Sequence, residues 1–282
     1  MTRAWDHIVD GLLNERQNKP RQTGVTMVID KGMGMAATKD LLEYAGEYID
    51  HWKFSFGTSV FVCEKRLKDK LALLTEHDVL TYPGGTLLEV ALVEHHCREF
   101  NQHAKRLGFS AVEISDGTIP LPTFRRANII DCAIQAGLIP ITEVGKKDPL
   151  NQPSPEEIAE QALSDLKAGA HWVIIEGRES GKNVGLFDNQ GSVNETQLGS
   201  ICNNMGEHVH QLIWEAPLKE QQALFINTFG TNVGLGNVPC GDVLAVESLR
   251  AGLRYETFSS IAERLLRSGS WDPFQIESHI TP

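Results

Sequence analysis

Long apolar runs are missing from this sequence. No stretch of about 18 apolar residues occurs, which is the length that a membrane-spanning helix needs, so no membrane partner is expected. Residues 1–24 are polar and amphipathic and lack the uninterrupted apolar segment of a secretory signal. No linker rich in glycine, serine or proline divides the chain. We therefore expect one cytoplasmic domain that covers residues 1–282.

Cysteine is also scarce. The five cysteines are odd in number, widely separated and never form a C-x-x-C pair; they are Cys63, Cys97, Cys132, Cys202 and Cys240. This pattern is typical neither of a disulfide framework nor of a zinc site. We expect the thiols to stay reduced.

Positive charge is in deficit. The chain has 26 lysines and arginines against 37 aspartates and glutamates, a formal net charge of −11. Non-specific nucleic-acid binding depends on a basic surface that neutralises phosphates, so nucleic acid is not expected as a partner. An anionic small-molecule substrate would require positive charge concentrated at one site.

Eight short apolar or β-branched runs recur along the chain, each followed by a polar or glycine-rich turn. They cover 25–30, 51–57, 79–85, 109–115, 139–145, 171–177, 211–216 and 232–238. Their starts are spaced by roughly 30 residues, the size of one strand and its crossover helix. The pattern predicts eight parallel strands.

Helical patterns separate these runs. The predicted helices cover 37–51, 86–107, 122–136, 154–168 and 218–229, with a last barrel helix at 241–253. Strands that alternate with helices form a parallel sheet, and eight of them in a chain of this length favour closure into a (β/α)₈ TIM barrel. We also expect an N-terminal helix at about 1–20 and a C-terminal extension at about 255–282, which includes an amphipathic stretch at 261–267.

Ionisable side chains follow nearly every predicted strand. The set is Asp30 with Lys31, Lys53, Tyr82, Glu113 with Asp116, Glu143 with Lys146 and Lys147, Glu176 with Arg178, and Glu215; the last strand carries Asn237. Barrel enzymes place their chemistry at the carboxyl ends of the strands. The pattern therefore predicts one charged site at that mouth.

Four glutamates stand out because strand residues flank them, in VEI, TEV, IEG and WEA. Burying carboxylates without partners costs several kcal/mol, so cations must lie between them. One interpretation is that they only pair with Lys53, Lys147 and Arg178. The other is a Mg²⁺ site, because Mg²⁺ prefers oxygen ligands. The candidate metal ligands are Glu143, Glu176, Glu215, Glu113 and Asp30.

Glycine-rich turns at two strand ends could bring backbone N–H groups close to an anion. They are Gly84–Gly85, and Gly236 with Asn237 in the eighth strand. The last two loops of such barrels often bind phosphate. With Lys31 and Ser115, these residues form the predicted substrate-binding set.

The linked motifs resemble the phosphosulfolactate synthase family. They are DKGMG, KFSFGTS, YPGGTL, VEISDGT, EVGKKDP, VIIEGRESGKNVGLFD, EAPLKEQQ and LGNV, in this order from about Val25 to Arg254. The resemblance implies a (β/α)₈ barrel that acts as a carbon–sulfur lyase. It would use Mg²⁺ to add sulfite to phosphoenolpyruvate, giving (2R)-2-phospho-3-sulfolactate for coenzyme M or sulfolactate synthesis.

The resemblance also implies residue roles. The second lysine of EVGKK, the proposed proton donor of the family, matches Lys147, and we add Lys53, Lys146 and Arg178 to the catalytic set. The family's K-F-G-W-G-T-S reads KFSFGTS here, and G-L-R-G-D-T reads GLRYETF. An alternative is a paralogue without synthase activity, similar to plant heat-stress-associated proteins, that acts by binding a partner. A further alternative is another barrel enzyme for phosphorylated enols, which would not explain the linked motifs. We expect a homo-oligomer.

Overall fold

The computed structural model describes residues 4–5, 8–9 and 15–275, and every statement below refers to these residues. Eight strands occur where the sequence predicts them. They are β1 (Thr26–Asp30), β2 (His51–Phe54), β3 (Leu80–Pro83), β4 (Ala111–Ile114), β5 (Ile139–Val144), β6 (Trp172–Ile175), β7 (Leu212–Glu215) and β8 (Gly234–Pro239). The predicted strands are confirmed.

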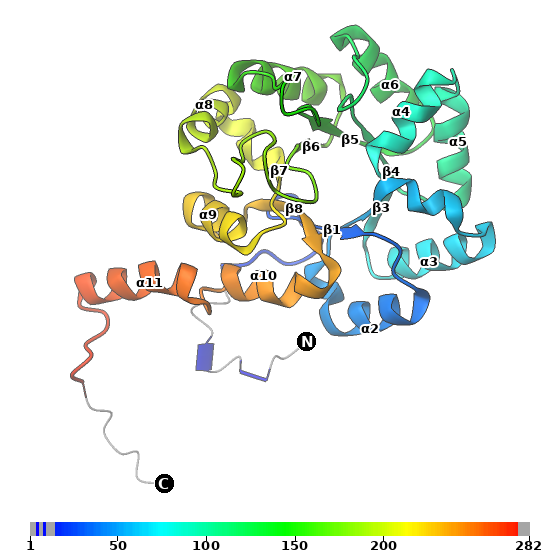
Figure 1. Cartoon of the computed structure of the whole chain (residues 1–282). Helices are drawn as coiled ribbons and strands as arrows, with labels where there is room; N and C mark the ends of the chain where they lie inside the picture. The colour runs from blue at the N-terminus through cyan, green and yellow to red at the C-terminus, as the bar shows by residue number, and fades with distance from the viewer. Residues whose placement is uncertain (1–3, 6–7, 10–14, 276–282) are drawn as a thin grey trace.

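The strands form one parallel sheet that curls into a nearly closed cylinder (Figure 1). The order is β3-β2-β1-β8-β7-β6-β5-β4, so β3 and β4 are the two edges that meet. At this seam the Ser110 N–H donates to the Thr81 carbonyl at 3.2 Å, and the Thr81 N–H donates to Ser110 Oγ at 2.8 Å. The predicted (β/α)₈ TIM barrel is confirmed.

Helices surround the cylinder. They are α2 (Met35–Ala45), α3 (Glu64–Glu76), α4 (Gly85–Val93), α5 (Cys97–Leu107), α6 (Thr123–Gln135), α7 (Pro155–Ala168), α8 (Glu195–Met205), α9 (Lys219–Phe229), α10 (Val243–Arg250) and α11 (Tyr255–Ser268). Short 3₁₀ segments follow α2 and β2, namely η1 (Gly46–Tyr48) and η2 (Ser55–Phe61), and two more are η3 (Gly206–Gln211) and η4 (Cys240–Asp242).

The single helix predicted at 86–107 is wrong, because the chain breaks between α4 and α5. His95 adopts a left-handed conformation with φ 64°, and the His96 N–H donates to the Ala91 carbonyl at 2.8 Å. This is the hydrogen-bond pattern with which helices often end at a glycine, made here by a histidine. Helices α3 and α8 were not predicted, and the helix predicted at 37–51 ends at Ala45 because His51 already belongs to β2.

Side chains alternate between two apolar layers along the strands. Inward-facing residues fill the cylinder; they are Val25, Met27, Tyr82, Ala111, Ile141, Trp172, Ile174 and Ile213. The residues between them pack outward against the helices, as Val28, Val112, Val173 and Trp214 do. Because the period is two, the side chain two residues beyond each inward-facing apolar residue also points into the cylinder.

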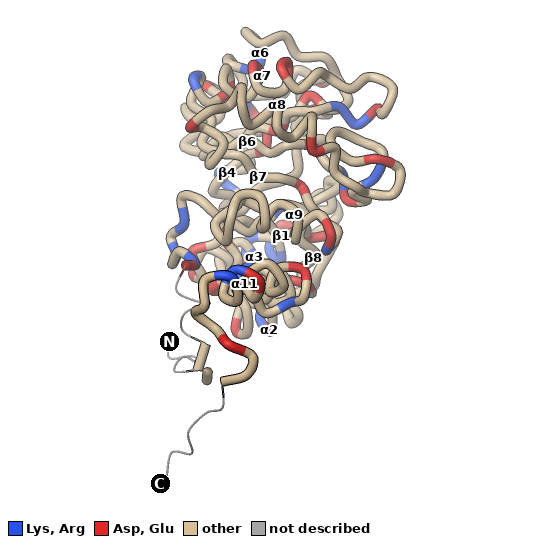
Figure 2. Tube along the Cα trace, turned by 90° about the vertical axis from the view of Figure 1, so that its left-hand side faces the viewer, with Lys and Arg blue, Asp and Glu red and all other residues tan. Residues whose placement is uncertain are grey.

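Of the predicted N-terminal helix at about 1–20, residues 1–3, 6–7 and 10–14 lie outside the described residues; residues 4–5 form a turn, residues 8–9 are helical, and 15–20 contain no helix. The C-terminal extension forms α11, which projects from the barrel beside α10 (Figure 1). Acidic and basic residues are interspersed over the visible trace (Figure 2). Among the described helices, none is long and apolar enough to cross a membrane.

Candidate active site

Four glutamates reach the mouth of the cylinder because of the strand alternation. Glu113 lies two residues after Ala111, Glu143 after Ile141, and Glu215 after Ile213, so each carboxylate continues an inward-facing row. Glu176 continues the row of Ile174 just beyond β6. All four are buried. The sequence prediction that they converge at one mouth agrees with this placement.

Lys53 on β2 sits at the centre of the cluster. Its Nζ lies 2.9 Å from Glu113 Oε2, 3.1 Å from Glu143 Oε2 and 3.1 Å from Glu215 Oε1. Burial alone would lower the pKa of Lys53, but the three carboxylates raise it well above its usual value. The ammonium group is therefore charged; it donates hydrogen bonds to Glu143 and Glu215 and forms an ion pair with Glu113.

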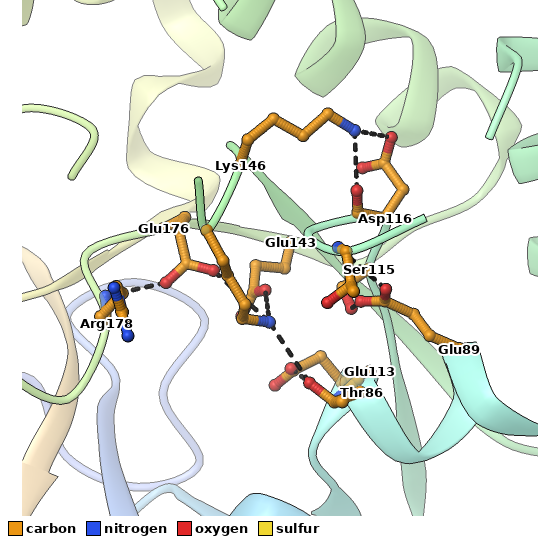
Figure 3. Close-up of polar contacts among 12 residues, drawn as sticks. Thr86, Glu89, Glu113, Ser115, Asp116, Glu143, Lys146, Glu176 and Arg178 are labelled. Carbon is orange, nitrogen blue, oxygen red and sulfur yellow. Dashed lines mark hydrogen bonds and ion pairs between the residues drawn. The ribbon is translucent and has the colours of Figure 1, made fainter. Parts of the chain in front are cut away.

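Lys147 extends over the same cluster from the loop after β5. Its Nζ lies 3.3 Å from Glu143 Oε1, 3.6 Å from Glu176 Oε2 and 3.4 Å from Thr86 Oγ1. Figure 3 shows Glu143, Glu176 and Thr86, the residues that supply these three oxygen atoms. The negative charge of Glu143 is the main cause that raises the pKa of Lys147 above its usual value. Unlike Lys53, the Lys147 side chain is one-third exposed (33%) and can meet a substrate.

A cavity of about 270 Å³ opens above these side chains. Its charged lining consists of Lys53, Lys147, Arg178, Glu113, Glu143, Glu176, Glu179 and Glu215. Five carboxylates thus face three cations. An anion would be repelled from this cavity unless protons or a metal ion offset the excess negative charge.

The pKa values of these carboxylates shift in different directions. Burial, with the charge of Glu143 against the opposing pull of Lys53, raises the pKa of Glu113 to about 7. Burial and the charges of Glu143 and Glu215 raise the pKa of Glu176 well above its usual value. For Glu143, burial is outweighed by Lys53 and Lys147, which lower its pKa. Without a further cation, the cluster therefore favours protons on some of its carboxylates.

Three of the glutamates could hold a metal ion. Oxygen atoms of Glu143, Glu176 and Glu215 all lie within 4.8 Å of one another. Glu176 Oε2 is buried and has no hydrogen-bond donor within the described chain. Buried carboxylates with an unsatisfied oxygen match the oxygen ligands of Mg²⁺, so these residues fit the predicted metal. Glu113 is further engaged, since its Oε1 accepts from the Gly85 N–H at 2.7 Å.

Asp30, another predicted metal ligand, faces a different set of partners. Its Oδ2 lies 2.5 Å from Lys70 Nζ and 2.9 Å from Trp52 Nε1, and its Oδ1 accepts from the Met33 N–H at 2.6 Å. Burial raises its pKa, but the bonds and charge of Lys70 outweigh burial, and the pKa is lowered overall. Asp30 therefore fixes the loop after β1 and is not brought to the glutamate cluster.

Lys146, predicted as catalytic, also points elsewhere. Its Nζ lies 2.5 Å from Asp116 Oδ2 and 2.7 Å from the Asp116 carbonyl (Figure 3). Asp116 in turn accepts from Arg126 Nη1 at 2.8 Å. These contacts tie the loop after β5 to the loop after β4. Lys146 thus helps to position its neighbour Lys147.

The predicted anion-binding glycines are placed at the cavity, but their amides are occupied. The Gly84 N–H donates to the Phe54 carbonyl at 2.9 Å, and the Gly85 N–H donates to Glu113. A Cβ on Gly85 would lie 2.3 Å from Ser115 Oγ, so close packing explains this glycine. Ser115 itself is buried and donates to Glu89 Oε1 at 2.5 Å. Neither amide nor Ser115 presents a free donor to the cavity.

The remaining predicted residues divide into two groups. Arg178 and Asn237 line the cavity. Gly236 of β8 is instead buried against Met27 of β1, and Lys31 lies over the Phe56 ring, 5.7 Å from its centroid. Asn237 has φ 53° at a bulge of β8 against β1, is 2% exposed, and its Oδ1 lacks a partner in the described chain. Its side-chain oxygen is therefore available to accept a hydrogen bond from a bound molecule.

Five residues that line the cavity were not among the predicted site residues. They are Ile29, Ser55, Phe56, Thr86 and Glu179. Ser55 is two residues beyond Lys53, so the strand alternation could have found it, whereas Thr86 lies in the first turn of α4. Phe56 could not be found in this way, because its left-handed backbone (φ 56°) follows no strand or helix pattern.

Comparisons with known proteins agree on one family. A family model described as (2R)-phospho-3-sulfolactate synthase matches residues 14–256. A phosphosulfolactate synthase of Methanothermobacter thermautotrophicus is 39% identical over 254 residues, covering 89% of this chain and 98% of the relative. One from Methanocaldococcus jannaschii is 41% identical over 242 residues, covering 85% and 96%.

Solved structures of other proteins share the fold of this chain. An aldolase from Escherichia coli K12 superposes with a TM-score of 0.55 at 11% identity, covering 96% of this chain and 98% of that chain. At this identity the likeness concerns the barrel alone.

Proposed function

This chain belongs to the (2R)-phospho-3-sulfolactate synthase family, and we propose that it joins sulfite to phosphoenolpyruvate to give (2R)-2-phospho-3-sulfolactate, with Mg²⁺ as its cofactor. One observation carries the proposal. Five carboxylates and three cations line a single cavity, a composition that suits two anions bound with a divalent ion.

Lys147 is the group that meets the reacting atoms. Addition of the sulfite sulfur to the methylene carbon of phosphoenolpyruvate leaves negative charge on the carboxylate side, and C2 then takes a proton. The Lys147 ammonium is charged and one-third exposed, and it lines the cavity. A proton delivered from one face fixes the configuration at C2.

Lys53 acts differently from Lys147. Its ammonium group is ion-paired with Glu113, Glu143 and Glu215, so it holds these carboxylates at fixed positions and offsets part of their charge. Preorganised charges of this kind need no rearrangement during the reaction. Lys53 is therefore a positioning residue in this scheme.

Glu143, Glu176 and Glu215 would hold the Mg²⁺ ion. When bound, the ion supplies Lewis acidity that stabilises negative charge on the substrate carboxylate. Arg178 remains for anion binding, whereas the unpaired oxygen of Asn237 suits a hydrogen-bond donor. Arg178 is exposed at the cavity rim, and within the described part of the chain only its backbone N–H is engaged, with Glu176 Oε1 at 2.8 Å (Figure 3).

The direct test incubates the purified chain with phosphoenolpyruvate, sulfite and Mg²⁺ while the vinyl absorbance is followed. We expect the absorbance to fall, a product with the mass of phosphosulfolactate to form, and EDTA to stop the reaction until Mg²⁺ is restored. No loss of phosphoenolpyruvate would refute the synthase activity and favour the binding-protein alternative. Turnover that is indifferent to EDTA would remove the metal from the scheme.

A further inference from the structure

The segment that carries Lys147 has no regular structure of its own. Residues 145–154 connect β5 to α7, and within this fully described stretch no residue belongs to a helix or a strand. The position of the Lys147 backbone therefore depends on bonds to other parts of the chain. Two of them come from the loop after β4: the Lys147 N–H donates to the Gly117 carbonyl at 3.2 Å, and Lys146 pairs with Asp116.

A single side chain, Gln152, bonds the carbonyl groups on both sides of Lys147. Its Nε2 lies 2.7 Å from the carbonyl oxygen of Lys146 and 2.6 Å from that of Asp148. The nitrogen of a primary amide carries two hydrogens, so each carbonyl can accept one of them. The residues immediately before and after Lys147 are thus held by the same amide group.

The oxygen of this amide reaches the loop after β6. Gln152 Oε1 accepts from the Gly185 N–H at 3.0 Å. Turning the amide over would place its oxygen against two carbonyls and its nitrogen against an N–H, so only one orientation satisfies all three backbone groups. Because β5 and β6 are neighbours in the barrel (Figure 1), the bonds of Gln152 join the loops that follow two adjacent strands.

Gly185 is a well-anchored point in the loop after β6. Its φ is 54°, and a Cβ there would lie 2.6 Å from the Glu176 carbonyl oxygen, so the Gly185 backbone packs directly against Glu176. The residues around it, Val184, Leu186 and Phe187, are buried. Val184 and Phe187 also exchange two backbone hydrogen bonds, at 3.2 Å and 2.9 Å. The irregular segment is therefore tied to a part of the chain that packing already fixes.

We propose that Gln152 is a positioning residue, which fixes the backbone of Lys147 relative to Glu176 and thereby sets the reach of the Lys147 ammonium over the glutamate cluster. This inference rests on the proposed function, in which Lys147 delivers the proton. Lys147 Nζ lies 3.3 Å from Glu143 Oε1 and 3.6 Å from Glu176 Oε2. Gln152 does not line the active-site cavity, so it acts through the segment that it holds. A displacement of about 1 Å at a reacting group can cost about 10²-fold in rate.

Three variants separate the bonds of Gln152. Gln152→Glu keeps nearly the same shape and can still accept from the Gly185 N–H, but at neutral pH it has no hydrogen for the two carbonyls and repels them. Gln152→Leu removes all three bonds. Asn151→Asp is the matched control, because it makes the same amide-to-carboxylate change one residue away, on an exposed side chain that makes no hydrogen bond within residues 15–275.

Steady-state kinetics with phosphoenolpyruvate and sulfite should show kcat lowered by about 10- to 10²-fold in Gln152→Glu and in Gln152→Leu, with KM changed by less than about threefold. Asn151→Asp should keep kcat within about twofold of the wild-type value. In a Lys147→Ala background, Gln152→Glu should cause no further loss, because a residue that acts through Lys147 has no amine left to position. The same fold loss in both backgrounds would overturn the proposal.

Hydrogen–deuterium exchange tests the contacts without any turnover. We expect faster exchange over residues 145–152 in both Gln152 variants, and faster exchange of the Gly185 amide in Gln152→Leu alone, whereas Asn151→Asp should match the wild-type chain. Unchanged exchange over 145–152 in Gln152→Leu would also overturn the proposal. If the wild-type chain shows no synthase turnover, the proposed function fails, and the exchange pattern alone decides whether Gln152 holds the two segments together.

Discussion

Arg126 Nη2 donates to the backbone carbonyl of Glu143 at 3.1 Å, and so joins helix α6 to the strand that carries the central carboxylate. The same guanidinium bonds Asp165 on α7 and Asp116 in the loop after β4. Arg126 is 0% exposed. This buried, fully paired arginine thus fixes the position of Glu143 at the mouth of the barrel, although Arg126 itself does not line the cavity.

Arg126→Leu should destabilise the protein by about 3–5 kcal/mol, because it leaves the buried Asp165 without its partner. Urea unfolding would measure the change. Replacing the partly exposed neighbour in Arg125→Leu should cost less than about 0.5 kcal/mol. The double variant Arg126→Leu with Asp165→Leu should recover part of the loss; no recovery would argue against this pair as the origin.

Lys147→Ala should lower kcat by about 10²–10⁴, the usual contribution of a positioned acid. Lys146→Ala is the matched comparison one residue away, and its kcat should fall less than about tenfold because its amine bonds Asp116. Steady-state kinetics with phosphoenolpyruvate and sulfite would measure both. Equal losses in the two variants would contradict the different roles assigned to the two lysines.

Mg²⁺ should raise the unfolding temperature of the wild-type chain, since an ion that binds only the folded state stabilises it. Glu143→Gln should abolish most of this rise by removing a charged ligand from the trio with Glu176 and Glu215. Glu179→Gln, at the exposed rim of the same cavity, should preserve it. Differential scanning calorimetry with and without Mg²⁺ would measure the unfolding temperatures. A rise in unfolding temperature that persists in Glu143→Gln would place the ion elsewhere.

The pKa of Glu113, raised to about 7 by burial, predicts a pH dependence of stability. Between about pH 4.5 and 7 the folded state keeps a proton on this group that the unfolded state releases, so the free energy of unfolding falls as pH rises, by at most about 1.4 kcal/mol per pH unit. Below this range the contribution is fully present, and above it the contribution is lost.

Glu113→Gln should remove this slope while its amide oxygen still accepts from the Gly85 N–H. The free energy of unfolding in urea, measured in EDTA at pH 5 and pH 7.5, should fall more in the wild-type chain than in the variant. Identical differences in the two proteins would mean that Glu113 keeps an ordinary pKa.

The barrel and the convergence of four glutamates followed from the sequence because both rest on local rules. A strand has a period of two, so a glutamate two residues after Ile141 or Ile213 must share the inward face. All eight strands share one direction, so their carboxyl ends meet at one mouth. No long-range information is needed for either step.

Asp30 and Lys146 show where such rules stop. Which cation faces Asp30 depends on α3, whose Lys70 comes 40 residues later in the chain, and Lys146 turns to Asp116 across two loops. Such pairings are decided by packing between elements. Gly85 is a similar case, since the close approach of Ser115 explains the glycine and its N–H is already bonded to Glu113.

The ion cluster also stabilises the barrel at the gap between β3 and β4. Lys53 on β2 and Glu113 on β4 stand on opposite sides of that gap, 2.9 Å apart, while the backbone there shares the single bond from Ser110 to Thr81. The charged side chains of the candidate active site therefore also hold the two sides of this gap together. Deuterium uptake should therefore rise first at this gap when the cation is removed, as in Lys53→Met, so loss of catalysis and loosening of the barrel would share one origin.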